Sequence, residues 1–309
     1  YNSGKGLILD IPFEKTAKES GGNKLMSNTV ALGAVLGLLE YDINILFGLL
    51  KESFQDKNQE VIQANIQAAQ AGYNLTHQKI KDSKLPRLNR TNGPPRMLIN
   101  GSETIALGAL AAGCKFISAY PMSPSTGIMT YLAFKAKEFN LIVEQSEDEI
   151  ASINLALGAA YAGVRAMTAT SGGGLALMVE GLSLSGMTET PIVIVDAQRP
   201  GPATGLPTRT AQEDLEYVIY AGHGESPRAV LAPLSIEDAF YLTVKAFNLA
   251  DKYQIPVIIL SDQLLADSYL TVDSFDVESL KIERHILSDE ELKNIKNYKR
   301  YQITDSGIS

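Results

Sequence analysis

Between residues 96 and 261, short apolar runs alternate with longer segments of helical periodicity. The apolar runs have the length and flanking turn residues of strands, and the segments between them can cross as helices from one strand to the next. This alternation predicts an α/β fold with a doubly wound parallel sheet, in which ligands bind at the carboxyl ends of the strands. The predicted strands are 96–99, 115–118, 141–144, 166–170, 191–196, 228–232 and 255–261, and the predicted helices are 103–113, 127–139, 148–162, 175–187, 212–220 and 236–253.

The rest of the chain predicts a smaller helical domain and two connecting segments. Residues 1–80 are mainly helical in pattern, with apolar residues at helical spacing. Residues 81–95, rich in proline, asparagine and basic residues, are predicted to be a linker. The α/β domain then covers 96–272, and 273–309 is expected to connect to a missing C-terminal domain. Because the chain starts at Tyr1 and stops on a turn signal, truncation at both ends is expected.

The composition is that of a globular protein, and it excludes several classes of function. The 309 residues are 45% hydrophobic, enough for a sizeable core, and no apolar run is long enough to span a bilayer. A net charge of −8 without any lysine- or arginine-rich run argues against nucleic acid or an anionic membrane as the partner. The single cysteine, Cys114, can form neither an internal disulfide nor an iron–sulfur site, so a cytoplasmic protein is expected.

A turn with two prolines, residues 120–126, follows the predicted strand 115–118. Pro121 and Pro124 restrict the backbone, so the turn holds the hydroxyl of Ser123 on stiff main chain. Stiff polar loops at strand ends are common ligand sites in α/β proteins. A plain proline-stiffened connection explains the same residues when they are taken alone.

Four carboxylates lie at the next junction between a strand and a helix, within residues 144–149. Any one of them can simply cap the helix or complement its dipole. Glu149, however, precedes a helix of small residues that must be buried on nearly every side. Its carboxylate is therefore expected in a cleft, where it suits proton sharing with a ligand nitrogen.

The ends of two further predicted strands carry residues that are common in ligand-binding sites. Residues 168–174 run from a strand into three glycines, which let backbone N–H groups approach a ligand closely, although tight helix packing also accounts for glycines there. Arg199 and Arg209 flank a loop of prolines and glycines, where they either clamp an anion or are ordinary surface arginines. The chain has neither a dinucleotide fingerprint nor a P-loop, and its scattered histidines predict no hydrolytic triad and no metal site.

Taken together and in order, these motifs resemble the α subunit of 2-oxoacid:ferredoxin oxidoreductases, especially the 2-oxoglutarate type. The resemblance runs from about residue 96 to residue 270, while residues 1–80 are similar to the end of the family's γ domain, which some members fuse ahead of α. The motifs are Tyr-Pro-Met-Ser-Pro-Ser-Thr at 120–126, Glu-Asp-Glu-Ile-Ala-Ser at 147–152, Thr-Ser-Gly-Gly-Gly at 170–174, and Gln-Arg-Pro-Gly-Pro-Ala-Thr-Gly-Leu-Pro-Thr-Arg-Thr at 198–210.

The resemblance implies an oxidoreductase whose thiamine diphosphate is shared between subunits. The α chain supplies the domain that holds the aminopyrimidine ring. The β subunit binds the diphosphate with Mg²⁺ and carries a [4Fe–4S] cluster that passes electrons to ferredoxin. The implied reaction is the coenzyme A-dependent oxidative decarboxylation of 2-oxoglutarate, or of pyruvate or a branched-chain 2-oxoacid. The implied assembly is (αβ)2. A non-catalytic binding or assembly module of the same fold is the alternative.

The resemblance also assigns roles to residues of this chain. Glu149 is the implied catalytic residue, since it would hydrogen-bond the pyrimidine nitrogen and promote the tautomer that activates the cofactor. The implied substrate-binding residues are Ser123, Arg199, Thr208 and Arg209, and the implied cofactor-binding residues are Tyr120, Pro121, Glu149, Thr170, Ser171 and Gly172.

Overall fold

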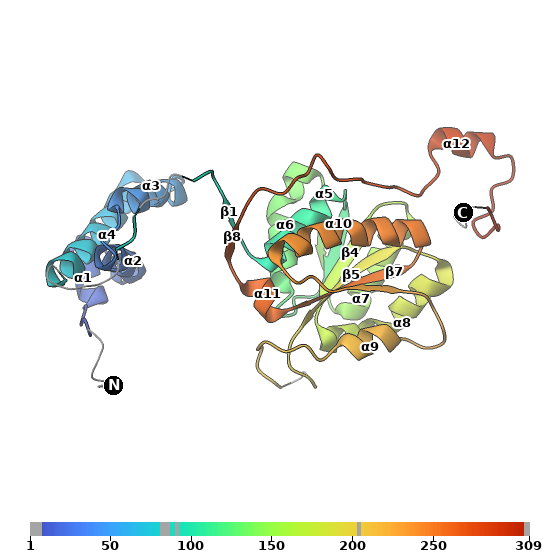
Figure 1. The fold of residues 1–309 in the computed structure, drawn as a ribbon, viewed down its shortest axis with the longest axis horizontal. Coiled ribbons are helices and arrows are strands. Elements are labelled where there is room, and N and C mark those ends of the chain that lie inside the picture. Colours follow the sequence, from blue (N-terminus) through green and yellow to red (C-terminus); the bar gives the residue numbers. More distant parts are fainter. Residues whose placement is uncertain (1–7, 81–86, 90–92, 203–204, 306–309) are drawn as a thin grey trace. The chain divides into compact units, whose positions relative to one another are not determined.

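The computed structural model describes residues 8–80, 87–89, 93–202 and 205–305, and the chain divides into two compact units at Pro94 and Pro95. Figure 1 shows a helical unit before this point and a mixed α/β unit after it. Of the predicted linker 81–95, only 87–89 and 93–95 are among the described residues. The predicted domain limits therefore stay a prediction.

The first unit consists of helices, as the pattern of residues 1–80 predicts. Asp42 and Asn58 cap the starts of two of them by accepting hydrogen bonds from the backbone N–H groups of Asn44 and Val61. The longest helix of the described residues runs from Gln59 to Lys79. The helices are α1 (Phe13–Glu19), the 3₁₀ helix η1 (Lys24–Met26), α2 (Ser27–Leu38), α3 (Ile43–Ser53) and α4 (Gln59–Lys79).

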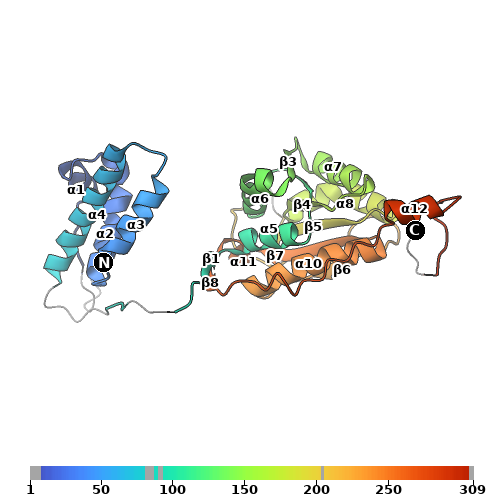
Figure 2. The same ribbon diagram turned by 90° about the horizontal axis from the view of Figure 1, so that it is seen from above.

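Helices α2 and α4 lie side by side in very close contact (Figure 2). The contact depends on glycines, because a Cβ built on Gly72 would overlap the carbonyl oxygen of Val30, and one on Gly33 would overlap that of Ala69. Close approach lets the Thr76 hydroxyl donate to the carbonyl oxygen of Ala34 at 2.8 Å, across the two helices. The small residues therefore set the separation of the pair.

We expect Gly72→Ala to lower the free energy of unfolding of this unit by about 1–3 kcal/mol, because the added methyl group forces the two helices apart. The matched control is Gly48→Ala in α3, where an added Cβ meets nothing within 4 Å. There alanine is expected to stabilise the helix by roughly 0.5–1 kcal/mol. Urea denaturation followed by circular dichroism measures both, and equal effects of the two substitutions would contradict the close contact.

The second unit is built on a six-stranded parallel sheet with the strand order β3-β2-β4-β5-β7-β6. The predicted doubly wound α/β fold is confirmed. The central strands β4, β5 and β7 are buried along almost their whole length, which explains their continuous apolar runs. The strands are β2 (Phe116–Ala119), β3 (Ile142–Gln145), β4 (Ala166–Thr170), β5 (Ile192–Gln198), β6 (Ala229–Leu231) and β7 (Pro256–Asp262).

Helices cover both faces of this sheet (Figures 1 and 2). One face packs against α5 (Gly101–Ala111), α6 (Thr126–Phe139) and α10 (Ile236–Tyr253). The other packs against α7 (Glu149–Tyr161), α8 (Gly172–Thr188) and α9 (Leu215–Tyr220). Successive residues of β5 alternate between these two cores, with Val193 and Val195 on the first face and Ile192 and Ile194 on the second.

The structure corrects the prediction at several places. The strand predicted at 96–99 is β1 (Met97–Ile99), and it lies outside the main sheet, paired antiparallel with the unpredicted strand β8 (Leu270–Val272). It cannot join β2, because β3 and β4 already occupy both edges of that strand. A short helix, α11 (Gln263–Asp267), was also not predicted, and a charged helix, α12 (Asp289–Asn294), lies within the predicted connecting segment 273–309.

Around the candidate site, three boundaries shift. Helix α8 begins at Gly172 and not at 175, so the three glycines form its first turn. Strand β5 continues through Gln198, two residues beyond the predicted strand 191–196. Helix α9 begins at Leu215 and not at 212.

A buried arginine holds the segment after β8 against the amino ends of the strands. The Arg165 side chain is fully buried and donates to Asp251 at 2.8 Å, to the carbonyl oxygen of Ala112 at 2.7 Å and to that of Glu283 at 2.7 Å. Arg284 forms a second ion pair with Asp251 at 3.1 Å. These contacts join α10, the start of β4 and residues 283–284 into one buried polar cluster.

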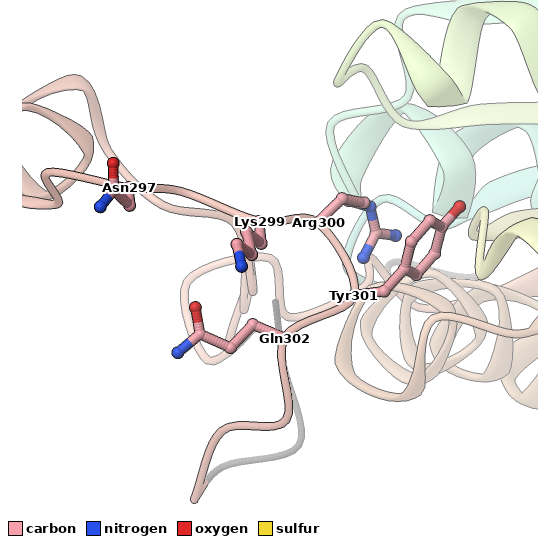
Figure 3. Close-up of a pocket in the computed structure, with 5 residues that line it drawn as sticks. All are labelled: Asn297, Lys299, Arg300, Tyr301 and Gln302. Carbon is pink, nitrogen blue, oxygen red and sulfur yellow. The ribbon is translucent and has the colours of Figure 1, made fainter.

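Further along, Arg300 donates to the carbonyl oxygen of Glu189, and the Tyr301 hydroxyl donates to that of Thr188. A pocket of about 750 Å³ lies here among residues of a single segment (Figure 3). It lies near the end of α8, opposite the end at which the predicted site residues gather. Among the described residues, no helix has the length and apolar character needed to cross a membrane.

Candidate active site

The four predicted ligand features all lie at the carboxyl ends of neighbouring strands. The turn 120–126 follows β2, Glu149 follows β3, the glycines follow β4 and Arg199 follows β5. Because β2 pairs with both β3 and β4, and β4 pairs with β5, these ends share one edge of the sheet. The topology therefore brings together features that are up to about 80 residues apart in sequence.

Glu149, the first residue of α7, is only 4% exposed, as the sequence predicts. Its neighbour Asp148 caps the helix by accepting a hydrogen bond from the N–H group of Ala151 at 2.7 Å, so Glu149 itself is not needed as the cap. Within the described part of the chain, Oε1 of Glu149 has no hydrogen-bond partner. A buried carboxylate oxygen without a hydrogen-bond partner can accept a hydrogen bond from a bound ligand.

A set of serine hydroxyls fixes the start of α7 against the sheet. Ser118 on β2 donates to the carbonyl oxygen of Ser152, and Ser152 donates to that of Asp148 at 2.8 Å. The hydroxyl of Ser146 contacts that of Ser152 and also donates to Asp148 at 3.1 Å. This network positions Glu149 without contacting its carboxylate.

The first turn of α8 packs directly against Glu149. A Cβ built on Gly174 would overlap the Thr170 hydroxyl and would lie 2.8 Å from Oε1 of Glu149. Gly174 therefore leaves room for the carboxylate, and the structure brings two predicted site residues, Glu149 and Thr170, to the same place. Gly172 serves a different contact, because its Cβ would lie 2.5 Å from the carboxylate of Asp214.

Ser171 is the N-cap residue of α8, but its side chain makes no capping hydrogen bond. Its hydroxyl is fully buried, and no described group accepts from it or donates to it. The N-terminal turn of α8 thus presents polar groups and its positive dipole end toward the shared edge of the sheet.

Ser123 and Arg199, both predicted to bind substrate, are also brought together. Nη1 of Arg199 donates to the carbonyl oxygen of Ser123 at 3.1 Å, while the side chain of Ser123 is exposed. Nε of Arg199 is buried and lacks a partner among the described residues. The guanidinium therefore keeps one N–H group that no described residue uses, next to the turn that carries Ser123.

The other predicted site residues make fewer contacts with the rest of the site. Arg209 is exposed and donates to the carbonyl oxygen of its neighbour Thr208 at 2.9 Å, which is a local contact within the loop. Tyr120 is 39% exposed and Pro121 is partly buried on the turn after β2. Residues 203 and 204, within the predicted motif 198–210, lie outside the described residues.

Sequence reasoning missed two acidic residues at the same edge. Asp196 lies in the second half of β5 and is completely buried, and neither of its carboxylate oxygens has a partner in the described structure. Burial, followed by the charge of Asp214, raises the pKa of Asp196 well above its ordinary value. Asp214 precedes α9, and its pKa is also raised, by burial and by the charge of Glu213. An acidic residue inside the apolar run of β5 was the signal available in the sequence.

Chemically, the edge offers a buried carboxylate for a ligand nitrogen and a guanidinium with a hydroxyl for a ligand carboxylate. The helix start at α8 adds N–H groups between them. This arrangement fits a cofactor and a small anionic substrate bound side by side. It contains no serine or cysteine nucleophile paired with a histidine among the residues that the structure describes.

Comparisons with known proteins find related families and structures. A family model described as pyruvate flavodoxin/ferredoxin oxidoreductase, thiamine diphosphate-binding, matches residues 107–305. A second model, described as pyruvate ferredoxin/flavodoxin oxidoreductase, matches residues 4–75. The two matches fall within the two units.

Curated relatives show the same similarity. The chain is 38% identical over 304 residues to the 2-oxoacid:ferredoxin oxidoreductase 1 subunit alpha of Sulfurisphaera tokodaii, covering 92% of this chain and 46% of that one. It is 46% identical over 168 residues to the 2-oxoglutarate synthase subunit KorA of Archaeoglobus fulgidus, covering 54% of this chain and 49% of that one. The chain thus spans about half the length of the curated relatives it matches.

A solved structure is similar over almost the whole chain. It is the 2-oxoglutarate:ferredoxin oxidoreductase from Magnetococcus marinus with 2-oxoglutarate, coenzyme A and succinyl-CoA bound. The TM-score is 0.83 at 38% sequence identity, and the similarity covers 99% of this chain and 54% of that chain.

Proposed function

Because this chain belongs to the pyruvate flavodoxin/ferredoxin oxidoreductase family, and within it to the α subunits of 2-oxoacid:ferredoxin oxidoreductases, we propose that it supplies the α half of an active site. The proposed reaction is the coenzyme A-dependent oxidative decarboxylation of a 2-oxoacid to an acyl-CoA and CO₂. Electrons pass to ferredoxin through the partner subunit. The observation that carries the proposal is the buried, unpartnered Oε1 of Glu149 beside Thr170 and Gly174.

The residues around Glu149 fit thiamine diphosphate. A carboxylate at the edge of a buried cleft, with Gly174 leaving space beside it, suits a ring nitrogen that must share a proton. When bound, the cofactor supplies a nucleophilic carbon for attack on the 2-oxo group. Glu149 would hold the proton at the pyrimidine nitrogen, and the residues that would line the ring are Tyr120, Pro121, Thr170, Ser171 and Gly172.

Ser123 and Arg199 bind the substrate in this proposal. Arg199 holds the carboxylate through the donor that its contact with Ser123 leaves free, and the Ser123 hydroxyl donates beside it. Thr208 and Arg209 help to select the distal end of the substrate. Because the similar structure has 2-oxoglutarate bound, we propose 2-oxoglutarate as the substrate ahead of pyruvate and branched-chain 2-oxoacids.

The remaining parts of the proposed enzyme lie on other chains. A β subunit binds the diphosphate through Mg²⁺ and carries the [4Fe–4S] cluster, in an (αβ)2 assembly. The only cysteine, Cys114, is buried and unpaired, and burial raises its pKa to about 12, so it is not a cluster ligand. A free, reduced thiol also suits the proposed cytoplasmic location.

The test is reconstitution of the full-length protein with its β subunit, followed by reduction of a viologen dye. We expect reduction to require a 2-oxoacid, coenzyme A and thiamine diphosphate together. A substrate panel of 2-oxoglutarate, pyruvate and a branched-chain 2-oxoacid identifies the substrate class. Assembly without turnover on any of them would favour a non-catalytic module and contradict the proposal.

In this assay, Arg199→Gln is expected to raise the KM for the 2-oxoacid by about tenfold or more, because a charge-assisted hydrogen bond to the carboxylate is lost. Arg209→Gln, on the same loop but exposed, is the matched comparison. It should change the KM for 2-oxoglutarate more than that for pyruvate if it contacts the distal carboxylate. An unchanged KM in Arg199→Gln would remove Arg199 from the substrate site.

A further inference from the structure

Helices α7 and α8 carry large hydrophobic side chains on their outer surfaces. The two helices lie side by side on one face of the sheet, where a Cβ built on Gly181 of α8 would overlap Ile153 of α7 (Figure 2). On the side away from the sheet, six large apolar side chains are each between 44% and 79% exposed. This α7–α8 face consists of Ile150, Leu155 and Tyr161 on α7 and of Leu177, Leu184 and Met187 on α8.

Several polar side chains of these helices point inward instead. Ser152 on α7 and Ser183 and Ser185 on α8 are buried, and their hydroxyls donate to backbone carbonyl oxygens. A helix that faces water has the reverse pattern, and α10 shows it, with Glu237 and Lys245 among its exposed residues. A helix that is apolar on nearly all sides belongs in an interior. The α7–α8 face is therefore a surface that another surface covers.

A glycine on the outer side of α7 supports the same conclusion. Gly158 is exposed in the middle of the helix, and a Cβ built on it meets nothing within 4 Å. Glycine at such a position weakens a helix relative to alanine. Elsewhere in this pair of helices a glycine admits a close neighbour, as Gly181 admits Ile153. Close approach of a second chain would give Gly158 the same purpose.

We propose that the α7–α8 face is the docking surface for the partner subunit that completes the cofactor site, which rests on the function proposed above. Both helices begin at that site, because α7 starts at Glu149 and the first turn of α8 packs against its carboxylate. Among the described residues, no cluster of side chains could hold a metal ion for a diphosphate. A chain that supplies one to the same cofactor has to lie next to Glu149, where the α7–α8 face begins.

The charges of this face indicate the chemistry of the partner. Within α7 and α8, both wholly described, the charged residues are the buried Glu149 and the exposed Glu180, and neither helix has a lysine or an arginine. Glu147 and Asp148, just before α7, are also exposed acids. We therefore expect an apolar partner surface flanked by basic side chains. A second copy of this chain on the same face would bring acids against acids, which disfavours it.

The first experiment is hydroxyl-radical footprinting of the full-length chain, alone and in complex with its β subunit. Tyr161 and Met187 are reactive probes on the face, and Tyr253, also exposed at the end of α10, is the control. We expect the modification of Tyr161 and Met187 to slow by about fivefold or more in the complex, because interface cores exclude water, and that of Tyr253 to stay unchanged.

Two footprinting results would overturn the proposal. One is equal modification of Tyr161 and Met187 in the free chain and in the complex, since the face would then stay open. The other is full protection in the chain without β. That result would assign the face to another segment of the chain or to a second copy.

Substitutions test the contribution of the face to binding. Leu177→Glu should raise the Kd for the β subunit by about 30-fold or more, because it places an unpaired charge within the interface. Tyr253→Glu, the matched control, should leave the Kd within about twofold. Calorimetric titration measures both, and thermal denaturation of the free chains checks their folding. An unchanged Kd in Leu177→Glu would exclude α8 from the interface.

Glu180→Lys distinguishes the two candidate occupants. Against a partner with basic side chains it should raise the Kd for β by about fivefold, because an attraction becomes a repulsion. On a face that binds a second copy, the same substitution would strengthen self-association of the α chain. Analytical ultracentrifugation of the α chain alone detects that outcome, which would contradict the proposal.

Gly158→Ala should act in opposite directions on the free chain and on the complex. Alanine is the better helix former, so the denaturation midpoint of the free chain should rise. The Kd for β should nevertheless rise by about fivefold or more, because the methyl group fills the space that the partner approaches. An unchanged Kd would contradict close approach at Gly158.

These readouts separate the docking surface from the proposed function. A complex with a protected face but without turnover of any 2-oxoacid would refute the function and leave the docking surface standing. Turnover in a complex whose Tyr161 and Met187 remain reactive would refute the docking surface and leave the function standing. Failure of the two full-length chains to associate would refute both.

Discussion

Replacing Glu149 with glutamine is expected to lower the rate of 2-oxoacid-dependent dye reduction by about 100-fold to 10,000-fold. Glutamine keeps the volume of the buried side chain beside Thr170 and Gly174, so the first turn of α8 has no reason to move. The amide can still form a hydrogen bond, but it cannot hold and return a proton at the position of Oε1. The measurement is kcat in the enzyme reconstituted from full-length α and β subunits.

The matched control is Glu147→Gln, since Glu147 is an exposed carboxylate two residues earlier. It removes the same charge from the same junction and should leave kcat within about twofold of the wild type. Thermal denaturation checks that both variants fold. Full activity in Glu149→Gln, with the fold intact, would remove Glu149 from the chemistry.

The largest expected effect on stability comes from Arg165→Met, which we expect to lower the free energy of unfolding of the α/β unit by about 3–5 kcal/mol. Methionine retains much of the aliphatic bulk but leaves Asp251 and the carbonyl oxygens of Ala112 and Glu283 without their donor. Among the described residues, only Arg284 then remains to pair with Asp251. The cost arises because buried acceptors lose a partner that water cannot replace.

Urea denaturation followed by circular dichroism, with hydrogen exchange in α10 to assign the transition, measures this loss. Arg96→Met is the comparison, because Arg96 pairs with Asp273 at the surface, where both side chains are substantially exposed. Its expected cost is below about 1 kcal/mol. Similar losses in the two variants would show that the Arg165 cluster contributes no more than a surface pair.

Most strands of the sheet could be predicted from the sequence, and particular elements show why. Strand β4 and helix α10 have the predicted bounds, since clear turn residues or caps delimit each apolar or amphipathic run. The prediction for β1 was wrong in its pairing. A run of three apolar residues can be identified locally, but its partner β8 lies more than 160 residues away, and pairing across that distance leaves no local signal.

Site residues could be predicted where a polar or charged residue directly follows the carboxyl end of a predicted strand. Glu149 was expected to be buried because the following helix has few polar residues, and the contact between Arg199 and Ser123 follows from the parallel order of β2, β4 and β5. Asp196 was missed because an acidic residue within an apolar run is uninformative until burial is known. Asp214 was missed because it resembles an ordinary helix cap, and only the fold shows that it turns toward Gly172.

The antiparallel pair of β1 and β8 gives the α/β unit a property of its own. Met97 lies opposite Val272, so the segment that forms the six-stranded sheet begins and ends at adjacent points of the chain. The unit itself continues, because residues 283–284 and 300–301 contact it again. A pulling force applied to the two flanking segments would therefore load the hydrogen bonds between β1 and β8 before it reached the strands that carry the candidate site.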